Sequence, residues 1–316
     1  MRKTYLIVDG NSLGHRAQNM GGILTLGTMQ VQAIYNFLQT LRGYALKHSM
    51  AIPIVLWDGI GWRHTRHIGY KSSREKTDTP AQQKQAEMRK HYQKQRPLIQ
   101  QALGFLGVTQ VQAQNMEADD LAAIMADLYA DQGHLVTLLS EDRDWLQIIR
   151  NGVALERPVS KDRISITNFE EVTEVPTPAM YAEVKAMMGD RGDDIDPIGG
   201  IGAKRATELV KAYGSFHGLL HGVMIDKTID PAGLPKYLRD LVASEEKALA
   251  FDFNMSLVDL RHPARPAVEN MQINAGAPSD EHFRQFCETL LFNSFLNNFG
   301  DWIAPFPVGK TQALAA

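Results

Sequence analysis

The chain has 316 residues, of which 44% are hydrophobic and 22% are charged, a composition typical of a globular protein with a sizeable core. The single cysteine, Cys287, excludes an internal disulfide framework and favours a reducing, cytoplasmic location. The apolar start before Asp9 is too short for a signal peptide and no 18-residue apolar run follows, so we expect neither secretion nor a membrane span.

The first half of the chain alternates between short apolar strands and helical patterns. The stretches TYLIVDG and IPIVLWDG each end in Asp-Gly, a strand-then-turn signal, and helical periodicity from Thr28 to His48 separates them. Further strands are predicted in GVTQVQ and HLVTLL. This alternation predicts an α/β fold with a doubly wound, mostly parallel central sheet.

A basic segment separates the second and third strands. Residues 61–101 contain ten Lys or Arg and three Asp or Glu, a charge of +7, which leaves −10 for the rest of a chain whose net charge is −3. This Gln- and Lys-rich segment has weak periodicity, so we expect an exposed helix or a mobile loop. Its charge indicates either a simple solvated helix or a surface for a polyanionic partner.

The character of the chain changes after about Arg157. The stretch RISI is a candidate edge strand, and Pro305 and Pro307 favour a surface-lying or disordered tail. We divide the chain into an α/β core at 1–176, a mainly helical region at 177–302 and a tail at 303–316. Helices are predicted at Thr177–Met188, Lys204–Tyr213, Phe216–His221 and Pro235–Phe251.

Acidic residues follow each of the four predicted strands, and more stand in a later loop. Each group alone has a plain explanation as a turn residue, a helix cap or an acidic loop. In parallel sheets, however, functional groups gather beyond the carboxyl ends of the strands. The set comprises Asp9, Asp58, Glu117, Asp119, Asp120, Asp142, Asp144, Asp190 and Asp193.

Nine acids converging on one crevice would repel one another strongly without cations. Hard oxygen ligands favour Mg²⁺ or Mn²⁺ over zinc, and clusters of this kind support two-metal phosphoryl transfer. None of these strands ends in a Ser, Cys or His nucleophile with partners. With the basic segment as a partner for a polyanion, the residues predict a nuclease.

Five motifs, in chain order, resemble those of the flap endonucleases or 5′-nucleases, which include bacteriophage 5′→3′ exonucleases and the 5′-nuclease domain of bacterial DNA polymerase I. They are the Asp-Gly strand ends, RHIGYKSSR, MEADD, SEDRDWLQ and GDRGDDIDPIGGIGAKRA. The resemblance implies a PIN-like 5′-nuclease fold, with a helical arch at about 61–101 and a helix-hairpin-helix-type element at about 189–212. It also implies a Mg²⁺- or Mn²⁺-dependent, structure-selective 5′→3′ exonuclease or flap endonuclease of DNA replication or repair.

The resemblance implies roles for individual residues of the site. Tyr70 would stack on the terminal base, and Lys71 and Arg74 would contact the scissile phosphate and stabilise its charge. Asp144, Asp190 and Asp193 would extend the metal site towards a second or outer ion. The inner metal cluster would consist of Asp9, Asp58, Glu117, Asp119, Asp120 and Asp142.

Other residues are implied to contact DNA without reading its sequence. In the family a single-stranded 5′ end threads through or under the arch, whose cations here include Arg66, Lys84, Arg89 and Lys90. In the hairpin, Gly200 and Gly202 would let the backbone approach a phosphate, Lys204 and Arg205 would add charge, and the carbonyls of Ile198 and Ile201 would hold K⁺.

The sequence departs from the family at Asp194-Ile195-Asp196-Pro197, where Asn-Ile-Pro-Gly is usual. We expect the two added charges either to weaken duplex binding or to alter the K⁺ site. The expected partner is DNA with 5′ ends or flaps, bound by a monomer away from membranes. Two alternatives remain: a ribonuclease that removes RNA from primers or RNA–DNA hybrids, and a branched-DNA-binding protein that has lost catalysis.

Overall fold

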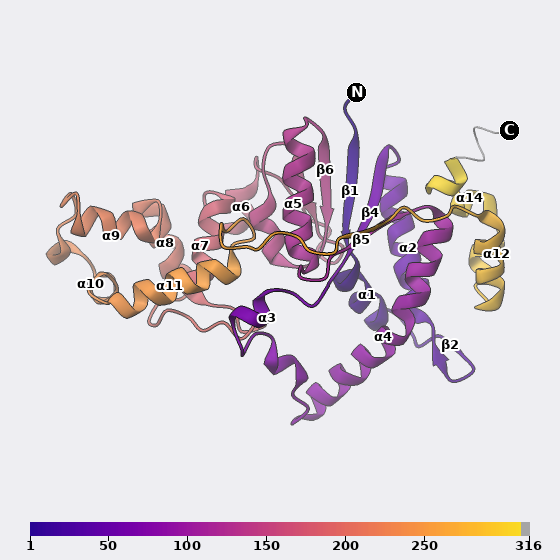
Figure 1. Ribbon diagram of the computed structural model, residues 1–316, viewed down its shortest axis with the longest axis horizontal. Coiled ribbons are helices and arrows are strands. Elements are labelled where there is room, and N and C mark those ends of the chain that lie inside the picture. Colours follow the sequence, from indigo (N-terminus) through magenta and orange to yellow (C-terminus); the bar gives the residue numbers. More distant parts are fainter. Residues whose placement is uncertain (311–316) are drawn as a thin grey trace.

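A seven-stranded sheet forms the centre of the computed structural model, which describes residues 1–310 (Figure 1). Five neighbouring strands are parallel, in the order β7, β6, β1, β4 and β5, and the edge strands β8 and β9 run antiparallel to them. The predicted doubly wound, mostly parallel sheet is therefore confirmed, as is the edge strand in RISI. The strands are β1 (Thr4–Asp9), β4 (Ala51–Trp57), β5 (Thr109–Gln112), β6 (Leu135–Leu139), β7 (Val153–Glu156), β8 (Arg163–Ile164) and β9 (Gln272–Asn274).

Alternate residues of the central strands face two separate hydrophobic cores. In β1, Tyr5 and Ile7 belong to the core that includes α5 (Ala118–Asp131). Leu6 and Val8 belong to the core formed with α1 (Gly10–Asn19), α2 (Gln32–Lys47) and α4 (Pro80–Leu106). Strands that are apolar on both faces are typical of parallel sheets covered on both sides by helices.

The strand register brings the predicted acidic positions to one edge of the sheet. Asp9 pairs with Leu56 of β4, and Val8 pairs with Leu139 of β6, so the three parallel strands end nearly level. Asp58 and Asp142 follow β4 and β6 by one and three residues. The carboxyl ends of the strands therefore deliver these side chains to the same side of the molecule.

The start of α2 differs from the sequence-based prediction. A small antiparallel hairpin of β2 (Thr25–Leu26) and β3 (Met29–Gln30) occupies the residues before it, so α2 begins at Gln32 rather than Thr28. The helix α1, which follows β1 directly, was not predicted, because its glycines and polar residues give little apolar periodicity.

The basic segment is mainly helical. It contains α3 (Arg63–Arg66), the short 3₁₀ helix η1 (Ser72–Glu75) and most of α4, and Figure 1 shows it projecting beyond the carboxyl ends of the strands. Thr79 caps α4 by accepting a hydrogen bond from Gln82 N at 3.3 Å, and Pro80 occupies the first helical position. Tyr92 and Ile99 are buried where α4 joins the body. Of the two expectations for this segment, the structure shows the exposed helix.

The helical region begins after β8. Its helices α7 (Pro178–Met188), α8 (Ala203–Tyr213) and α9 (Phe216–Met224) lie close to their predicted bounds. The single helix predicted at 235–251 is wrong, because Ser244 accepts a hydrogen bond from Lys247 N and starts a new helix. The remaining elements are η2 (Arg143–Ile148), α6 (Phe169–Thr173), η3 (Pro231–Gly233), α10 (Lys236–Val242) and α11 (Glu245–Val258).

The C-terminal residues return to the α/β body, which corrects two predictions. After α11 the chain places β9 beside β5, and α12 (Asp280–Thr289), α13 (Asn293–Leu296) and α14 (Phe299–Ile303) lie near α2 and α4 (Figure 1). The helical region therefore does not continue to residue 302. Phe306 is fully buried and Val308 is 4% exposed, so the predicted tail is wrong for 303–310, while 311–316 lie outside the described residues. Pro305 follows the end of α14, and the chain stays in the core because Phe306 and Val308, on either side of Pro307, are buried.

Within residues 1–310, no helix combines the length and the apolar character needed to cross a membrane.

Candidate active site

A cavity of about 400 Å³ lies beyond the carboxyl ends of β1, β4 and β6. Seven of the nine acids predicted from the sequence line it, and so do Lys71 and Arg74. Glu117 and Asp120 are not among its lining residues. The acids are Asp9, Asp58, Asp119, Asp142, Asp144, Asp190 and Asp193, and the remaining lining residues are Asn11, Ser12, His15 and Gly192.

Each inner carboxylate is held in place by a hydrogen bond from the surrounding fold. Asp9 is the last residue of β1 and caps the start of α1. Its Oδ1 accepts a hydrogen bond from Ser12 N at 2.9 Å, and its Oδ2 accepts one from Ser140 Oγ at 2.8 Å. Asp58 Oδ1 accepts from the backbone N–H of Ala118 at 2.8 Å. These bonds fix the orientation of the side chains before any ligand arrives.

Asp119 is oriented in the same manner by an aromatic side chain. Its Oδ1 accepts a hydrogen bond from the indole Nε1 of Trp145 at 2.6 Å. Trp145 is fully buried in η2, so the donor is itself immobile. Neither Trp145 nor Ser140 was predicted from the sequence, because their roles depend on contacts between distant segments.

Burial and mutual repulsion make the inner carboxylates difficult to ionise together. Burial, reinforced by the charge of Asp58, raises the pKa of Asp9 from 3.8 to about 7. Burial likewise raises the pKa of Asp58, and it raises the pKa of Asp119 with a further contribution from Asp142 and Asp9. Within the described residues, no Lys or Arg lies within salt-bridge distance of these three acids.

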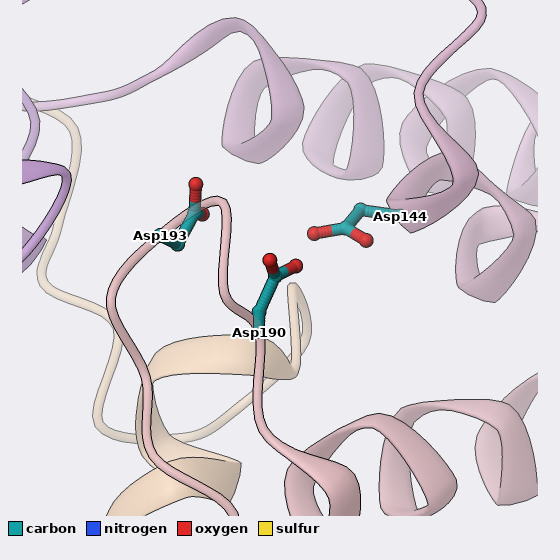
Figure 2. A group of neighbouring side chains, drawn as sticks. All are labelled: Asp144, Asp190 and Asp193. Atoms are coloured by element: carbon teal, nitrogen blue, oxygen red, sulfur yellow. The ribbon is translucent and has the colours of Figure 1, made fainter. Parts of the chain in front are cut away.

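A second group of acids lies at the other side of the cavity. Figure 2 shows Asp144 turned towards Asp190 and Asp193, which belong to the loop after α7. One carboxylate oxygen from each lies within 4.8 Å of the others, so the three could hold a metal ion. Lys185 of α7 donates to Asp190 Oδ2 at 2.9 Å and also contacts Asp144 Oδ1. This lysine was not predicted, because its only sequence signal is its place five residues before Asp190.

Asp120 is the clearest departure from the predicted inner cluster. Its side chain is fully buried and forms a two-pronged ion pair with Arg63, at 2.8 Å and 2.9 Å. Asp120 also accepts a hydrogen bond from Glu117 N at 3.2 Å, as a helix-capping residue does. Asp120 thus does not line the cavity, and Arg63 compensates its charge.

Glu117 lies beside this ion pair, behind the cavity. It accepts hydrogen bonds from Lys71 Nζ and from the Tyr70 hydroxyl, and Arg63 Nη1 lies 3.2 Å from its Oε2. Although burial opposes ionisation, Lys71 and Arg63 hold the pKa of Glu117 below its ordinary value. Glu117 therefore connects the MEADD motif to the base of the arch.

Tyr70, for which base stacking was predicted, is buried in this structure. Only 4% of the residue is exposed, and its hydroxyl donates to Glu117 Oε2 and to Asp193 Oδ2, each at 2.9 Å. Lys71 Nζ lies 4.7 Å from the centroid of the ring, so the lysine covers one of its faces. The ring that does line the cavity is His15 on α1, which packs against Tyr92 with ring centroids 4.5 Å apart.

Lys71 and Arg74 lie at the mouth of the cavity, where the sequence predicted cationic groups. The ammonium of Lys71 contacts Glu117, and Arg74 Nη2 donates to Asp193 Oδ1 at 2.6 Å. Arg74 is exposed, whereas the side chain of Lys71 is 15% exposed. Both can therefore reach an anion that enters the cavity.

The predicted DNA contacts occupy the arch and the loop before α8. Arg66, Lys84 and Lys90 are exposed, and Arg89 donates to the carbonyl of Arg74 at 2.5 Å. Near α8, Gly200, Gly202, Lys204 and Arg205 are exposed, and the Ile198 and Ile201 side chains are buried. Arg205 donates to Gly200 O at 3.0 Å and lies over the Tyr237 ring.

A larger cavity of about 1090 Å³ extends from the acidic cavity to the start of α8. It shares Ser12, Asp142, Asp144 and Asp190 with the acidic cavity. From there it reaches Ala203, Lys204 and Thr207 at the start of α8. The acids and the start of α8 therefore open onto one depression.

Comparison with known proteins supplies a family for this arrangement. The model of the 5′-3′ exonuclease, N-terminal resolvase-like domain matches residues 4–175. A thermostable DNA polymerase I of Thermus thermophilus is 28% identical over 306 residues, covering 96% of this chain and 34% of the relative. DNA polymerase I of Mycobacterium leprae is 32% identical over 229 residues, covering 69% and 24%. The chain spans about a third of the length of the first curated relatives that it matches.

Solved structures share the fold at lower sequence identity. The T5 5′-exonuclease with bound zinc superposes with a TM-score of 0.66 at 22% identity, covering 92% of this chain and 99% of that one. Flap endonuclease-1 from Methanococcus jannaschii gives a TM-score of 0.54 at 17% identity, covering 90% and 85%. At these identities the likeness concerns the fold, and it agrees with the predicted 5′-nuclease architecture.

Proposed function

The chain belongs to the 5′-3′ exonuclease (5′-nuclease) family, and we propose that it is a structure-selective nuclease that cleaves DNA at 5′ ends and 5′ flaps. The observation that carries this proposal is the convergence of seven acids, Lys71 and Arg74 on one cavity at the carboxyl edge of the sheet. The chain is similar to a thermostable DNA polymerase I and to the T5 5′-exonuclease, and these names support a nuclease that acts on DNA. We place the activity in DNA replication or repair, in the cytoplasm.

The residues of the cavity fit divalent cations. All the candidate ligands are carboxylate oxygens, which suit Mg²⁺ or Mn²⁺, and the raised pKa values of Asp9, Asp58 and Asp119 indicate a charge that the protein itself does not balance. We assign Asp9, Asp58, Asp119 and Asp142 to one ion and Asp144, Asp190 and Asp193 to a second. When bound, two such ions would polarise the attacking water and the scissile phosphate.

The protein's own residues would position the substrate around that site. Lys71 and Arg74 face the cavity and would draw in the scissile phosphate, stabilising the negative charge that grows during cleavage. Because Glu117 does not line the cavity and contacts Lys71, that carboxylate would orient the ammonium rather than hold a metal. Asp120 would act through Arg63, which it keeps in place.

The basic surfaces suit DNA bound without sequence preference. Exposed cations of the arch, including Lys84 and Lys90, would attract a single-stranded 5′ end. The free N–H groups at the start of α8 and the side chain of Lys204 would contact phosphates of the duplex. We retain the backbone carbonyls of Ile198 and Ile201 as the proposed K⁺ ligands, and we propose that the protein acts as a monomer.

Cleavage of a matched series of substrates tests this function. The series would compare flap, nicked, blunt-duplex, single-stranded and RNA–DNA hybrid substrates, with Mg²⁺ and with a chelator. We expect Mg²⁺-dependent cleavage of DNA at 5′ ends and flaps, with products that carry 5′-phosphates. Preferred cleavage of the RNA strand would indicate a ribonuclease, and flap binding without any cleavage would indicate a binding protein.

A pair of variants connects the activity to the cavity. Asp142→Asn should abolish cleavage and leave flap binding largely intact, because Asp142 lines the cavity. Asp162→Asn is the matched control, since Asp162 is about half exposed and lies outside the cavity. Full cleavage by Asp142→Asn would refute the proposed metal site.

A further inference from the structure

Two residues with unusual backbone conformations meet at the base of the arch. Lys71, just before η1, has φ 57°, and Asp194, in the loop after α7, has φ 56°. This left-handed region is disfavoured for residues with a Cβ atom, and it persists only where neighbouring contacts enforce it. Lys71 lines the acidic cavity, and Asp194 follows Asp193, which also lines it, so the contacts that hold both residues affect the geometry of the cavity.

The two segments are joined by several hydrogen bonds. Lys71 N donates to Asp193 O at 3.1 Å, and Arg74 Nε donates to Gly192 O at 3.1 Å. His67 Nε2 lies 2.9 Å from the carbonyl of Asp194. The base of the arch is thus fastened to the loop that carries Asp190 and Asp193.

The side chain of Asp194 makes a further bond in this interface. Its Oδ2 accepts from Ser73 N at 2.7 Å. Lys71, which precedes η1, makes no capping hydrogen bond with its own side chain. Asp194 therefore supplies, from 121 residues away, the acceptor that the first turn of η1 lacks.

We propose that Asp194 is a positioning residue that clamps the base of the arch to the acidic loop and so holds Lys71 and Arg74 at the cavity. This inference rests on the proposed nuclease function. It gives residue 194, where the family usually has asparagine, a role within the site. The Asp194 carboxylate accepts a hydrogen bond from Ser73 at the base of the arch, so its charge is directed towards the arch and not towards the proposed duplex-binding loop.

The geometry requires a hydrogen-bond acceptor at residue 194, whatever its charge. An asparagine offers an amide oxygen in the same place and tolerates the left-handed conformation. An alanine removes the acceptor and is less suited to a positive φ. Asp196, two residues away and exposed, provides a matched removal of charge.

The test measures single-turnover cleavage of a 5′-flap duplex, its Kd with Ca²⁺ in place of Mg²⁺, and amide hydrogen exchange over residues 67–76. We expect Asp194→Ala to slow cleavage at least tenfold, to change Kd less than threefold and to increase exchange at Ser73 and Arg74. Asp194→Asn should restore the rate to within threefold of the wild type, and Asp196→Ala should keep it. In a Lys71→Ala background, the further loss caused by Asp194→Ala should shrink, because both changes act on one group.

Two outcomes would overturn the clamp. One is an Asp194→Ala variant that cleaves at the wild-type rate with unchanged exchange. The other is a slow Asp194→Asn variant, which would assign the effect to charge. If the wild-type protein cleaved none of the substrates, the proposed function would fail, and the exchange measurement alone would decide whether Asp194 holds the arch.

Discussion

Replacing Asp120 with Asn should destabilise the protein and leave the metal site largely intact. The change leaves Arg63 buried with less compensating charge, because Arg63 is 2% exposed and Asp120 is fully buried. Burial opposes the charge on Arg63, but Asp120 more than compensates, so the pKa of the guanidinium lies above its ordinary value. The pair is therefore a structural unit of α3 and α5.

The size of the effect follows from which partners remain. Removing one member of a buried ion pair costs about 3–5 kcal/mol. In Asp120→Asn, Arg63 keeps the carbonyl of Leu257 at 2.7 Å and Glu117 at 3.2 Å. We therefore expect the lower end, about 3 kcal/mol, which corresponds to a fall in Tm of roughly 6–12 °C at about 2–4 °C per kcal/mol.

Asp119→Asn is the matched control, one residue earlier on the same helix. Burial and the charge of Asp142 raise the pKa of Asp119, so its ionised form is unfavourable in the protein without metal. The amide oxygen of Asn can still accept the hydrogen bond from Trp145. Asp119→Asn should consequently raise the Tm of the metal-free protein.

Thermal unfolding in EDTA and again with increasing Mg²⁺ distinguishes the two sites. Asp120→Asn should melt lower than the wild type and retain its Mg²⁺-induced rise in Tm, whereas Asp119→Asn should melt higher and lose most of that rise. If Asp120 were a ligand of the inner metal cluster, as the family resemblance implies, Asp120→Asn would instead abolish cleavage. A wild-type Tm in EDTA together with a lost Mg²⁺ response in Asp120→Asn would refute the reasoning from the ion pair.

Three further predictions concern the cavity and the C-terminal core. The pKa of Asp9 is raised from 3.8 to about 7 in the folded protein, so the folded state binds a proton more tightly than the unfolded state. The metal-free protein should therefore lose stability as pH rises from 3.8 through about 7, and the Mg²⁺ affinity measured by calorimetry should rise over the same interval. A pH-independent affinity would contradict this. Lys71→Ala should lower the single-turnover rate on a flap substrate by roughly 10²-fold with little change in Kd, as expected for a group that stabilises developing charge; equal losses in rate and affinity would assign Lys71 to binding. Phe306→Ala should cost about 3–5 kcal/mol in urea unfolding, whereas Leu291→Ala, at a position 65% exposed, should cost little; equal effects would refute burial of the C-terminal segment.

The sequence was sufficient for the sheet and for acids that follow its strands. Asp9 and Asp58 could be placed because buried parallel strands have a strong apolar pattern and end at a common edge. Asp119 and Asp120 could not be told apart in this way. Neighbouring residues on a helix point about 100° apart, so only one of them faces the cavity, and the residue that decides which, Arg63, lies 57 positions away from Asp120.

Tyr70 and Lys185 show the same limit. An aromatic residue within a basic motif has no sequence signal that separates a stacking surface from a buried hydroxyl donor. Its environment is set by Glu117 and Asp193, which are 47 and 123 positions away. Lys185 lies on a helix with an ordinary apolar pattern, and its contacts with Asp144 and Asp190 appear only when α7 packs against η2.

The distribution of protein cations among the acids separates two classes of carboxylate. Glu117, Asp120, Asp144, Asp190 and Asp193 each lie within salt-bridge distance of Arg63, Lys71, Arg74 or Lys185. Asp9, Asp58 and Asp119 have no such partner within the part of the chain that the structure describes, and their pKa values are raised. A fold that leaves Asp9, Asp58 and Asp119 uncompensated at one cavity gains stability when an external cation, the first of the two proposed ions, binds them. Neutralising Asp9, Asp58 or Asp119 should therefore stabilise the metal-free protein. Neutralising Glu117 or Asp190, whose pKa values are held low by paired cations, should destabilise it. The acidic motif alone does not contain this difference in sign.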